Sequence, residues 1–241
     1  MRMASKCLDV DHCRLGVLAF GDSITNGGGE LQWGVALQSW ALWTSRGLGL
    51  PYTSYAVDGA LTAGVLAHQI PGFELGAAHP TARYELGCLY IGTNDVRGTA
   101  WDARAFAADF DPALAFIAAR CDRVLAVTLP RDLGRPRAPA KVAECNAAIV
   151  TAARRHGALL LDLSAFAARN LMMADHVHPT AFGQIAIAER ALDLLAADGM
   201  RVRVRPSTLI SYEPTWWGAI RGDATYLYRH AKISARALLS G

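Results

Sequence analysis

Short apolar runs alternate with longer amphipathic segments along most of this chain. Five runs have the length and apolar content of buried strands: 15–20, 52–57, 86–91, 124–128 and 158–162. Helical patterns separate or follow them at 32–46, 61–69, 103–119, 140–156 and 179–197. This alternation predicts an α/β fold, in which a parallel sheet of five strands carries helices on both faces through right-handed crossovers.

Composition agrees with a single core followed by a short extension. Of the 241 residues, 52% are hydrophobic and 19% are charged, which provides material for a sheet covered on both faces and argues against extensive disorder. We expect residues 1–200 to form one domain and residues 201–241 to form an extension of different character, described below.

Polar residues follow two of the predicted strands at the point where each strand ends. Ser23 closes the tripeptide Gly-Asp-Ser after the first strand, and Asn94 follows the third strand in Gly-Thr-Asn-Asp. Because the carboxyl ends of parallel strands meet at one edge of a sheet, these loops can lie together. With Asp175 and His178 further along the chain, they supply the nucleophile, base, orienting carboxylate and oxyanion donor that acyl transfer requires.

Each of these pieces has an ordinary structural alternative. Ser23 can be a helix N-cap, Asn94 can belong to a turn, and His178 before a proline can be a surface loop residue. The placement of two pieces directly after buried strands is what favours the catalytic interpretation.

The ordered set resembles the SGNH or GDSL hydrolases, whose four signature blocks match at Ser23, Gly59, Asn94 and His178. The resemblance covers about residues 14 to 198. It implies a three-layer α/β/α sandwich, flavodoxin-like, with strand order 2-1-3-4-5, and it implies no cofactor. It also makes Ser23 the nucleophile, His178 the base and Asp175 the orienting acid, with oxyanion donors from the Ser23 and Gly59 N–H groups and the Asn94 side chain.

The last block has a spacing that suits a catalytic histidine. With Asp175 three positions before His178, its carboxylate can bond Nδ1–H of the histidine while Nε2 faces Ser23. His176 is a competing base, but it is one residue from Asp175 and is expected to point away. Asp22 is a competing acid, but a carboxylate in that turn is expected to be a structural cap. A metal site is disfavoured because no fourth ligand of matching spacing is present.

One position departs from the family pattern. Ser54 stands where many relatives carry an asparagine ahead of the second-block glycine. That asparagine is not an oxyanion donor, so the departure concerns the hydrogen bonds of the loop.

Four residues flank the catalytic loops and are candidates for substrate binding: Trp33, Arg97, Trp101 and Met172. The tryptophans and the methionine can form an apolar wall for an acyl chain, and core packing explains them equally well. Arg97 can hold an anionic group or the alcohol part of a sugar ester, or it can be a surface charge.

The functional interpretation is a serine esterase that acts on a small-molecule, lipid or sugar ester through an acyl-serine intermediate. Transfer of the acyl group to a sugar or another alcohol uses the same first half-reaction, so an acyltransferase is the alternative. A non-catalytic binding protein on the same scaffold is the second alternative, and the intact catalytic set argues against it.

The chain shows no secretory signal, because charged residues interrupt positions 7 to 14, and its apolar runs are too short to cross a membrane. The five cysteines are an odd number without metal-type spacing, and two lie in or beside apolar strands. We therefore expect reduced thiols and a cytoplasmic protein.

Basic and aromatic residues distinguish the extension. Residues 201–241 carry seven basic and two acidic residues, whereas residues 1–200 carry 17 basic and 19 acidic ones. A helix is expected at 224–239. Such a segment suits a lipid headgroup surface, and hence peripheral membrane binding. We favour the commoner role, in which the aromatic residues dock on the α/β body or on a second subunit. Nucleic acid is not an expected partner, because the body is acidic and has no recognised motif.

Overall fold

A computed structural model describes residues 14–76, 82–134, 137–168 and 170–212, together with 216, 224, 227, 228, 230–232 and 235. Five parallel strands form one sheet in the order β2-β1-β3-β4-β5. They are β1 (Val17–Gly21), β2 (Tyr52–Ser54), β3 (Tyr84–Tyr90), β4 (Cys121–Val127) and β5 (Leu159–Leu161). The predicted α/β class, strand number and flavodoxin-like order are confirmed.

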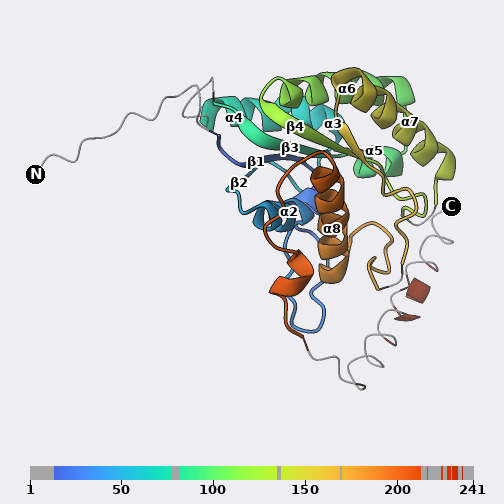
Figure 1. Cartoon of the computed structure of the whole chain (residues 1–241). Coiled ribbons are helices and arrows are strands. Elements are labelled where there is room, and N and C mark those ends of the chain that lie inside the picture. Colours follow the sequence, from blue (N-terminus) through green and yellow to red (C-terminus); the bar gives the residue numbers. More distant parts are fainter. Residues whose placement is uncertain are drawn as a thin grey trace, which may run out of the picture.

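Helices cover both faces of this sheet (Figure 1). The longer ones are α2 (Trp40–Leu48), α6 (Ala103–Ala118), α7 (Pro139–His156) and α8 (Ala181–Ala197). The shorter ones are α1 (Ser23–Asn26), α3 (Thr62–Gly64), α4 (Ile70–Gly76) and α5 (Thr93–Arg97), with a π-helix at Val65–Gln69 and a 3₁₀ helix at Pro206–Leu209. In the view of Figure 1, α4, α6 and α7 lie above the sheet and α2 and α8 lie below it, which makes three layers.

The central strands are buried because helices cover them on both sides. Val17, Leu18 and Phe20 of β1 are fully buried, as are Leu86 and Leu89 of β3. Such strands carry continuous apolar runs rather than alternating ones, which is why they were readable in the sequence.

Two predicted helices have different bounds in the structure. The helix expected at 32–46 begins only at Trp40, because Ser39 caps it by accepting hydrogen bonds from the N–H groups of Ala41 and Leu42. The helix expected at 61–69 continues through the π-helix and α4 to Gly76. The helix expected at 224–239 falls partly outside the described residues.

Residues beyond position 200 begin by packing on this domain. The N–H groups of Arg203 and Val204 donate to the carbonyl of Gly47 at 2.8 and 3.2 Å, next to the end of α2. The 3₁₀ helix, orange-red in Figure 1, lies beside α2 and α8. Among the described residues, no helix is both long enough and apolar enough to cross a membrane.

Candidate active site

The nucleophile turn follows β1 directly. Gly21 ends the strand at φ 155°, where a Cβ would lie 2.4 Å from the carbonyl oxygen of Tyr90, so only glycine fits. Asp22 caps α1 by accepting a hydrogen bond from Ile24 N–H at 3.0 Å, which confirms the expected structural cap. Ser23 is then the first helical residue, and its side chain projects from the end of the strand.

Ser23, His178 and Asp175 form a continuous hydrogen-bonded chain. Ser23 Oγ lies 2.9 Å from His178 Nε2, and His178 Nδ1 lies 2.8 Å from Asp175 Oδ2. The second Asp175 oxygen accepts from the N–H groups of Val177 and His178 at 2.9 and 3.1 Å. The carboxylate therefore fixes both the position of the imidazole and the tautomer in which Nε2 can accept the serine proton.

This arrangement moves the pKa values of both partners. The bond to Asp175 raises the pKa of His178 above its ordinary value; burial opposes this shift, and the negative charge of Asp22 adds to it. Burial disfavours the ionised form of Asp175, but hydrogen bonds from the His178 side chain and from the N–H groups of Val177 and His178 outweigh burial and lower the pKa of that carboxyl. The contact thus favours the charged form of both side chains, the ionised Asp175 and the protonated His178.

His176, the competing base, faces elsewhere. Its backbone has φ 55°, and its Nδ1 lies 3.0 Å from an oxygen of Asp132. The ring is therefore directed toward the loop that follows β4 rather than toward Ser23. Within the described part of the chain, no group of three or more metal-type side chains could hold an ion.

Besides Ser23 N–H, the predicted oxyanion donors come from the Gly59 loop and from α5, which are tied together. Asn94 Nδ2 donates to the carbonyl of Ala60 at 3.0 Å, and the Asp95 carboxylate accepts from Thr62 N–H at 3.1 and 3.2 Å. Gly59 sits at φ 75°, and a Cβ there would meet no atom within 4 Å, so its surroundings are open. One N–H of the Asn94 amide is thus used locally and a second remains for a substrate oxygen.

The departure at Ser54 has a local replacement. Ser54 Oγ accepts a hydrogen bond from Ala56 N–H at 3.3 Å, so the hydroxyl supports the loop that leads to Gly59.

Two buried glutamines hold the nucleophile turn, and the sequence patterns did not single them out. Gln69, the last residue of the π-helix, pairs with both backbone groups of Gly21 at 3.0 and 2.8 Å. Gln184 of α8 donates to the carbonyls of Ile24 and Gly28 at 3.0 Å and accepts from Trp40 N–H at 2.8 Å. A buried amide in an otherwise apolar helix was the available signal, since such a group must find partners.

Asp22 carries an unusual carboxyl behind the nucleophile. Its Oδ2 and the hydroxyl of Thr93 are both buried without a hydrogen-bond partner within the described residues. Burial raises the pKa of Asp22 to about 7, against the opposing effects of the Ile24 N–H bond and the nearby His178. The carboxyl group therefore ionises less readily than an ordinary aspartate.

Two of the four candidate substrate-binding residues, Trp33 and Met172, pack against other protein side chains. Trp33 stacks on Tyr212 with ring centroids 5.8 Å apart and meets Phe182 edge-on at 5.5 Å. Met172 is buried in the main core and bridges to Pro179. Both residues support loops near the site, and direct contact of either with substrate stays a prediction.

The other two candidates lie on the side of α5. Arg97 is exposed, its side chain lies against Gly134, and its positive charge tends to lower the pKa of His178. Trp101 Nε1 donates to a carboxylate oxygen of Glu144 on α7 at 2.8 Å, which directs that indole toward the helix layer. Arg97 is thus the candidate whose charge reaches the catalytic histidine.

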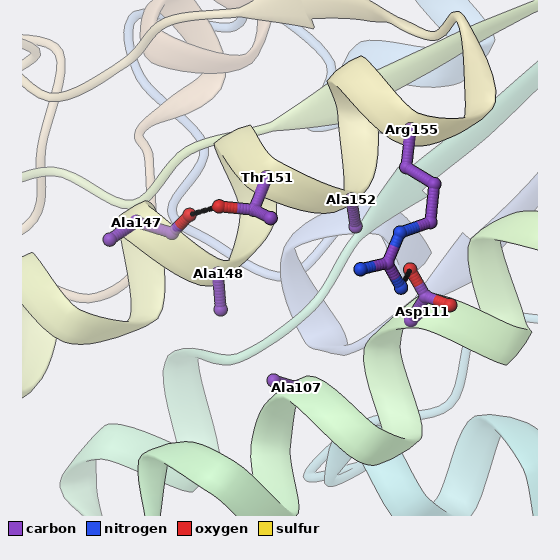
Figure 2. Close-up of a pocket in the computed structure, with 7 residues that line it drawn as sticks. All are labelled: Ala107, Asp111, Ala147, Ala148, Thr151, Ala152 and Arg155. Atoms are coloured by element: carbon purple, nitrogen blue, oxygen red, sulfur yellow. Dashed lines mark hydrogen bonds and ion pairs between the residues drawn. The ribbon is translucent and has the colours of Figure 1, made fainter.

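A hollow of about 280 Å³ lies elsewhere, between α6 and α7 (Figure 2). Four alanines floor it, and Asp111, Thr151 and Arg155 stand at its polar side. Figure 2 shows these polar groups already bonded, Thr151 to the carbonyl of Ala147 and Arg155 to Asp111 at 2.9 Å. It contains none of the catalytic candidates, so the site lies at the sheet edge and not in this hollow.

The model of the GDSL-like lipase/acylhydrolase family matches residues 19–185, which is more than half of the chain. Among curated proteins, no match was found.

Solved structures show the same fold at low identity. A GDSL-family lipolytic protein of Veillonella parvula is 21% identical, with a TM-score of 0.60, over 75% of this chain and 98% of its own. The α/β hydrolase LAE5 from the metagenome of Lake Arreo, Spain, is 17% identical, with a TM-score of 0.57, over 78% and 98%. A variant of the acetyl xylan esterase Axe2 of Geobacillus stearothermophilus is 17% identical, with a TM-score of 0.58, over 78% and 96%. The family match and the shared fold together show that this chain belongs to the GDSL-like lipase/acylhydrolase family of serine hydrolases.

Proposed function

We propose that the protein is an esterase that cleaves carboxylic esters through an acyl-serine intermediate. The observation that carries the proposal is the chain from Ser23 Oγ through the His178 imidazole to Asp175, with links of 2.9 and 2.8 Å. The links are short enough for proton transfer, and the carboxylate holds the base in the required orientation.

The reaction follows from these positions. Ser23 Oγ attacks the ester carbonyl carbon while His178 Nε2 accepts the hydroxyl proton, and the carbonyl oxygen becomes an oxyanion. Its charge is stabilised by the N–H groups of Ser23 and Gly59 and by the free N–H of Asn94. The C–O bond to the alcohol then breaks, His178 returns its proton to the leaving oxygen, and water repeats the sequence to release the acid.

The rim of the site supports an ester with an apolar portion. Val57 and Leu61 flank Gly59 in sequence and are 53% and 49% exposed, so they present an apolar lip beside the proposed oxyanion hole. Arg97, on the side of α5, supplies a positive charge that suits a polar or anionic group on the same substrate.

Pre-steady-state kinetics with short p-nitrophenyl esters tests the mechanism. We expect a burst of one p-nitrophenol per protein and an acyl adduct on the Ser23 peptide, and Ser23→Ala should lower kcat by about three orders of magnitude or more. Turnover like the wild type in Ser23→Ala would end the nucleophile assignment. Adding sugar acceptors separates the two catalytic readings, since acylated sugar in place of free acid would identify a transferase.

A cytoplasmic location remains part of this proposal. Cys88, Cys121 and Cys145 are buried free thiols, whereas Cys7 and Cys13 lie outside the described residues. Free thiols suit a reducing compartment.

A further inference from the structure

The start of the C-terminal extension is attached along α8. Glu189 on that helix accepts hydrogen bonds from Ser207 N–H and Oγ at 2.9 and 2.8 Å and pairs with Arg205 at 3.1 Å. Ile210 packs against the apolar cluster that Trp43 of α2 and Ile185 of α8 help to form. The extension lies outside the family match, which ends at residue 185.

The extension then reaches an aromatic cluster next to the site. Tyr212 stacks on Trp33 at 5.8 Å and meets Phe182 edge-on at 4.7 Å, and Trp33 and Phe182 also touch. Phe182 stands four residues after His178, in the first turn of α8. Tyr212 therefore holds the chain on the carboxyl side of the catalytic histidine.

Trp33 belongs to a loop that touches the catalytic pair. In this loop, the carbonyl of Glu30 accepts from Ala181 N–H at 2.9 Å, and Gly28 N–H donates to the Ser23 carbonyl at 2.6 Å. A Cβ on Gly28 would lie 3.3 Å from the His178 ring, so the loop passes close to the imidazole. A shift of the aromatic cluster would therefore displace the loop beside His178.

The extension makes a second contact on the other side of the same histidine. The His230 ring lies 5.7 Å from the ring of His176, two residues before His178. His176 is itself fixed, since its N–H donates to the Met173 carbonyl at 3.0 Å and its carbonyl accepts from Gly134 N–H at 2.8 Å. In Figure 1, the dark red helical pieces of the extension lie on the side of the gold loops that follow β5.

We propose that the C-terminal extension positions the catalytic histidine, with Tyr212 and His230 holding the His178 loop from its two ends. Neither residue touches the reacting atoms, so both are positioning residues rather than catalytic ones. The inference rests on the esterase proposed above and deepens it by assigning the segment outside the family match to the geometry of the base.

The rate at which a small fluorophosphonate labels Ser23 tests this role in the full-length protein, because labelling needs a well-placed His178 but no particular ester. We expect Tyr212→Ala to slow labelling about tenfold to a hundredfold, since small displacements of catalytic groups have effects of that size. Tyr212→Phe should label like the wild type, because the contacts of Tyr212 use its ring and not its hydroxyl. His230→Ala should slow labelling about threefold to tenfold.

A pH profile from about pH 5 to about pH 9 separates positioning from simple loss of stability. The charged groups that act on His178 are Asp175, Asp22 and Arg97. If the extension holds the imidazole against Asp175, loss of the extension's contacts weakens the bond between His178 and Asp175 and lowers the pKa of His178. The acid limb of the labelling rate then moves to lower pH in Tyr212→Ala and His230→Ala. Tyr228→Ala is the matched control, because Tyr228 belongs to the same segment and is 67% exposed.

Each other outcome contradicts the proposal. Wild-type rate and acid limb in both alanine variants overturn it, and so does an effect of Tyr212→Ala alone, which would leave only one point of attachment. If Tyr212→Ala fails to fold, His230→Ala decides by itself. Loss confined to esters in anionic vesicles would show surface recruitment instead. A wild-type protein that is not labelled at Ser23 would instead refute the proposed esterase.

Discussion

The nucleophile turn and the catalytic histidine loop are held in place by different means. The turn is part of the interior: Asp22 is fully buried, Gly21 fits against β3, and the amides of Gln69 and Gln184 bond the backbone on either side of Ser23. The histidine loop lies closer to solvent. The side chain of His178 is 28% exposed and that of Asp175 is 29% exposed. The Asp175 carboxylate stabilises the loop by accepting three hydrogen bonds, from the N–H groups of Val177 and His178 and from the His178 ring, and the loop also packs against neighbouring segments.

Because of this difference, substitutions in the two parts of the site should have different effects on stability and on catalysis. Interior amides leave unsatisfied polar groups when they are removed, so removing Gln69 or Gln184 affects the fold as well as catalysis. Changes to the side chains of His178 and Asp175 act mainly on the base, because both side chains are partly exposed. The predictions below are ordered by their expected effect on turnover.

Asp175→Asn should have the largest effect of the four, about a 10³-fold to 10⁴-fold loss of kcat, because the amide favours the wrong tautomer of His178. The carboxylate also raises the pKa of His178, so its removal lowers that pKa and moves the acid limb of kcat/KM to lower pH. Steady-state kinetics across pH measures both effects. A large loss of kcat with an acid limb at the wild-type pH would separate Asp175 from the titration of the base.

Asn94→Ala should lower kcat by about 10²-fold to 10³-fold with a smaller change in KM, because the amide bond to substrate strengthens as the oxyanion develops. The same substitution removes the bond to the Ala60 carbonyl, so thermal unfolding provides the control. A change in KM alone would make Asn94 a substrate-binding residue.

Gln184→Leu tests the role of the buried amides that hold the nucleophile turn. It leaves Trp40 N–H and the Gly28 carbonyl without the Gln184 amide, each worth about 1 to 3 kcal/mol when unsatisfied, whereas the Ile24 carbonyl keeps the N–H of Gly27 at 3.4 Å. We expect a lower free energy of unfolding and a loss of kcat of about tenfold to a hundredfold. Asp193→Leu, on the exposed side of the same helix, removes only an ion pair with Arg205 at 2.7 Å and should change the free energy of unfolding by less than about 1 kcal/mol, because exposed pairs contribute little. Equal effects of the two changes would contradict the assigned role.

Asp22→Asn should leave turnover close to that of the wild type and change the pH dependence of stability. The pKa of Asp22 is about 7 in the fold, whereas an aspartate in the unfolded chain titrates near 3.9. Between these values the unfolded state gives up a proton that the fold retains, so this group lowers stability as pH rises, by up to about 4 kcal/mol. Denaturant unfolding at several pH values should show that the free energy of unfolding of the variant, relative to that of the wild type, increases as pH rises from about 4 to about 7. A constant difference would contradict the raised pKa.

The sheet was predictable because its strands carry local signals, whereas the pairing of Ser23 with His178, 155 residues away, was implied by the resemblance of the four blocks to a known family. Continuous apolar runs mark buried parallel strands, and glycines mark turns that no other residue can adopt. The sequence analysis missed the start of α2, because a loop of mixed polarity before Ser39 imitates a helical pattern and only the cap settles the boundary.

The supporting residues could not be predicted in the same way. Gln69 and Gln184 act on Ser23 from 46 and 161 residues away, and only the packing of the π-helix and α8 brings them to the turn. The contact of Tyr212 with Trp33 likewise depends on the path of the chain around α8. Such long-range partners leave no periodic trace in the sequence.

Mass spectrometry after treatment with a serine-directed phosphonate tests whether Ser23 is a nucleophile activated by His178. We predict one adduct per chain, located on the Ser23 peptide, formed quickly in the wild type and absent from Ser23→Ala, with slow formation in His178→Ala. An adduct on any other residue, or undiminished labelling of Ser23→Ala, would contradict it.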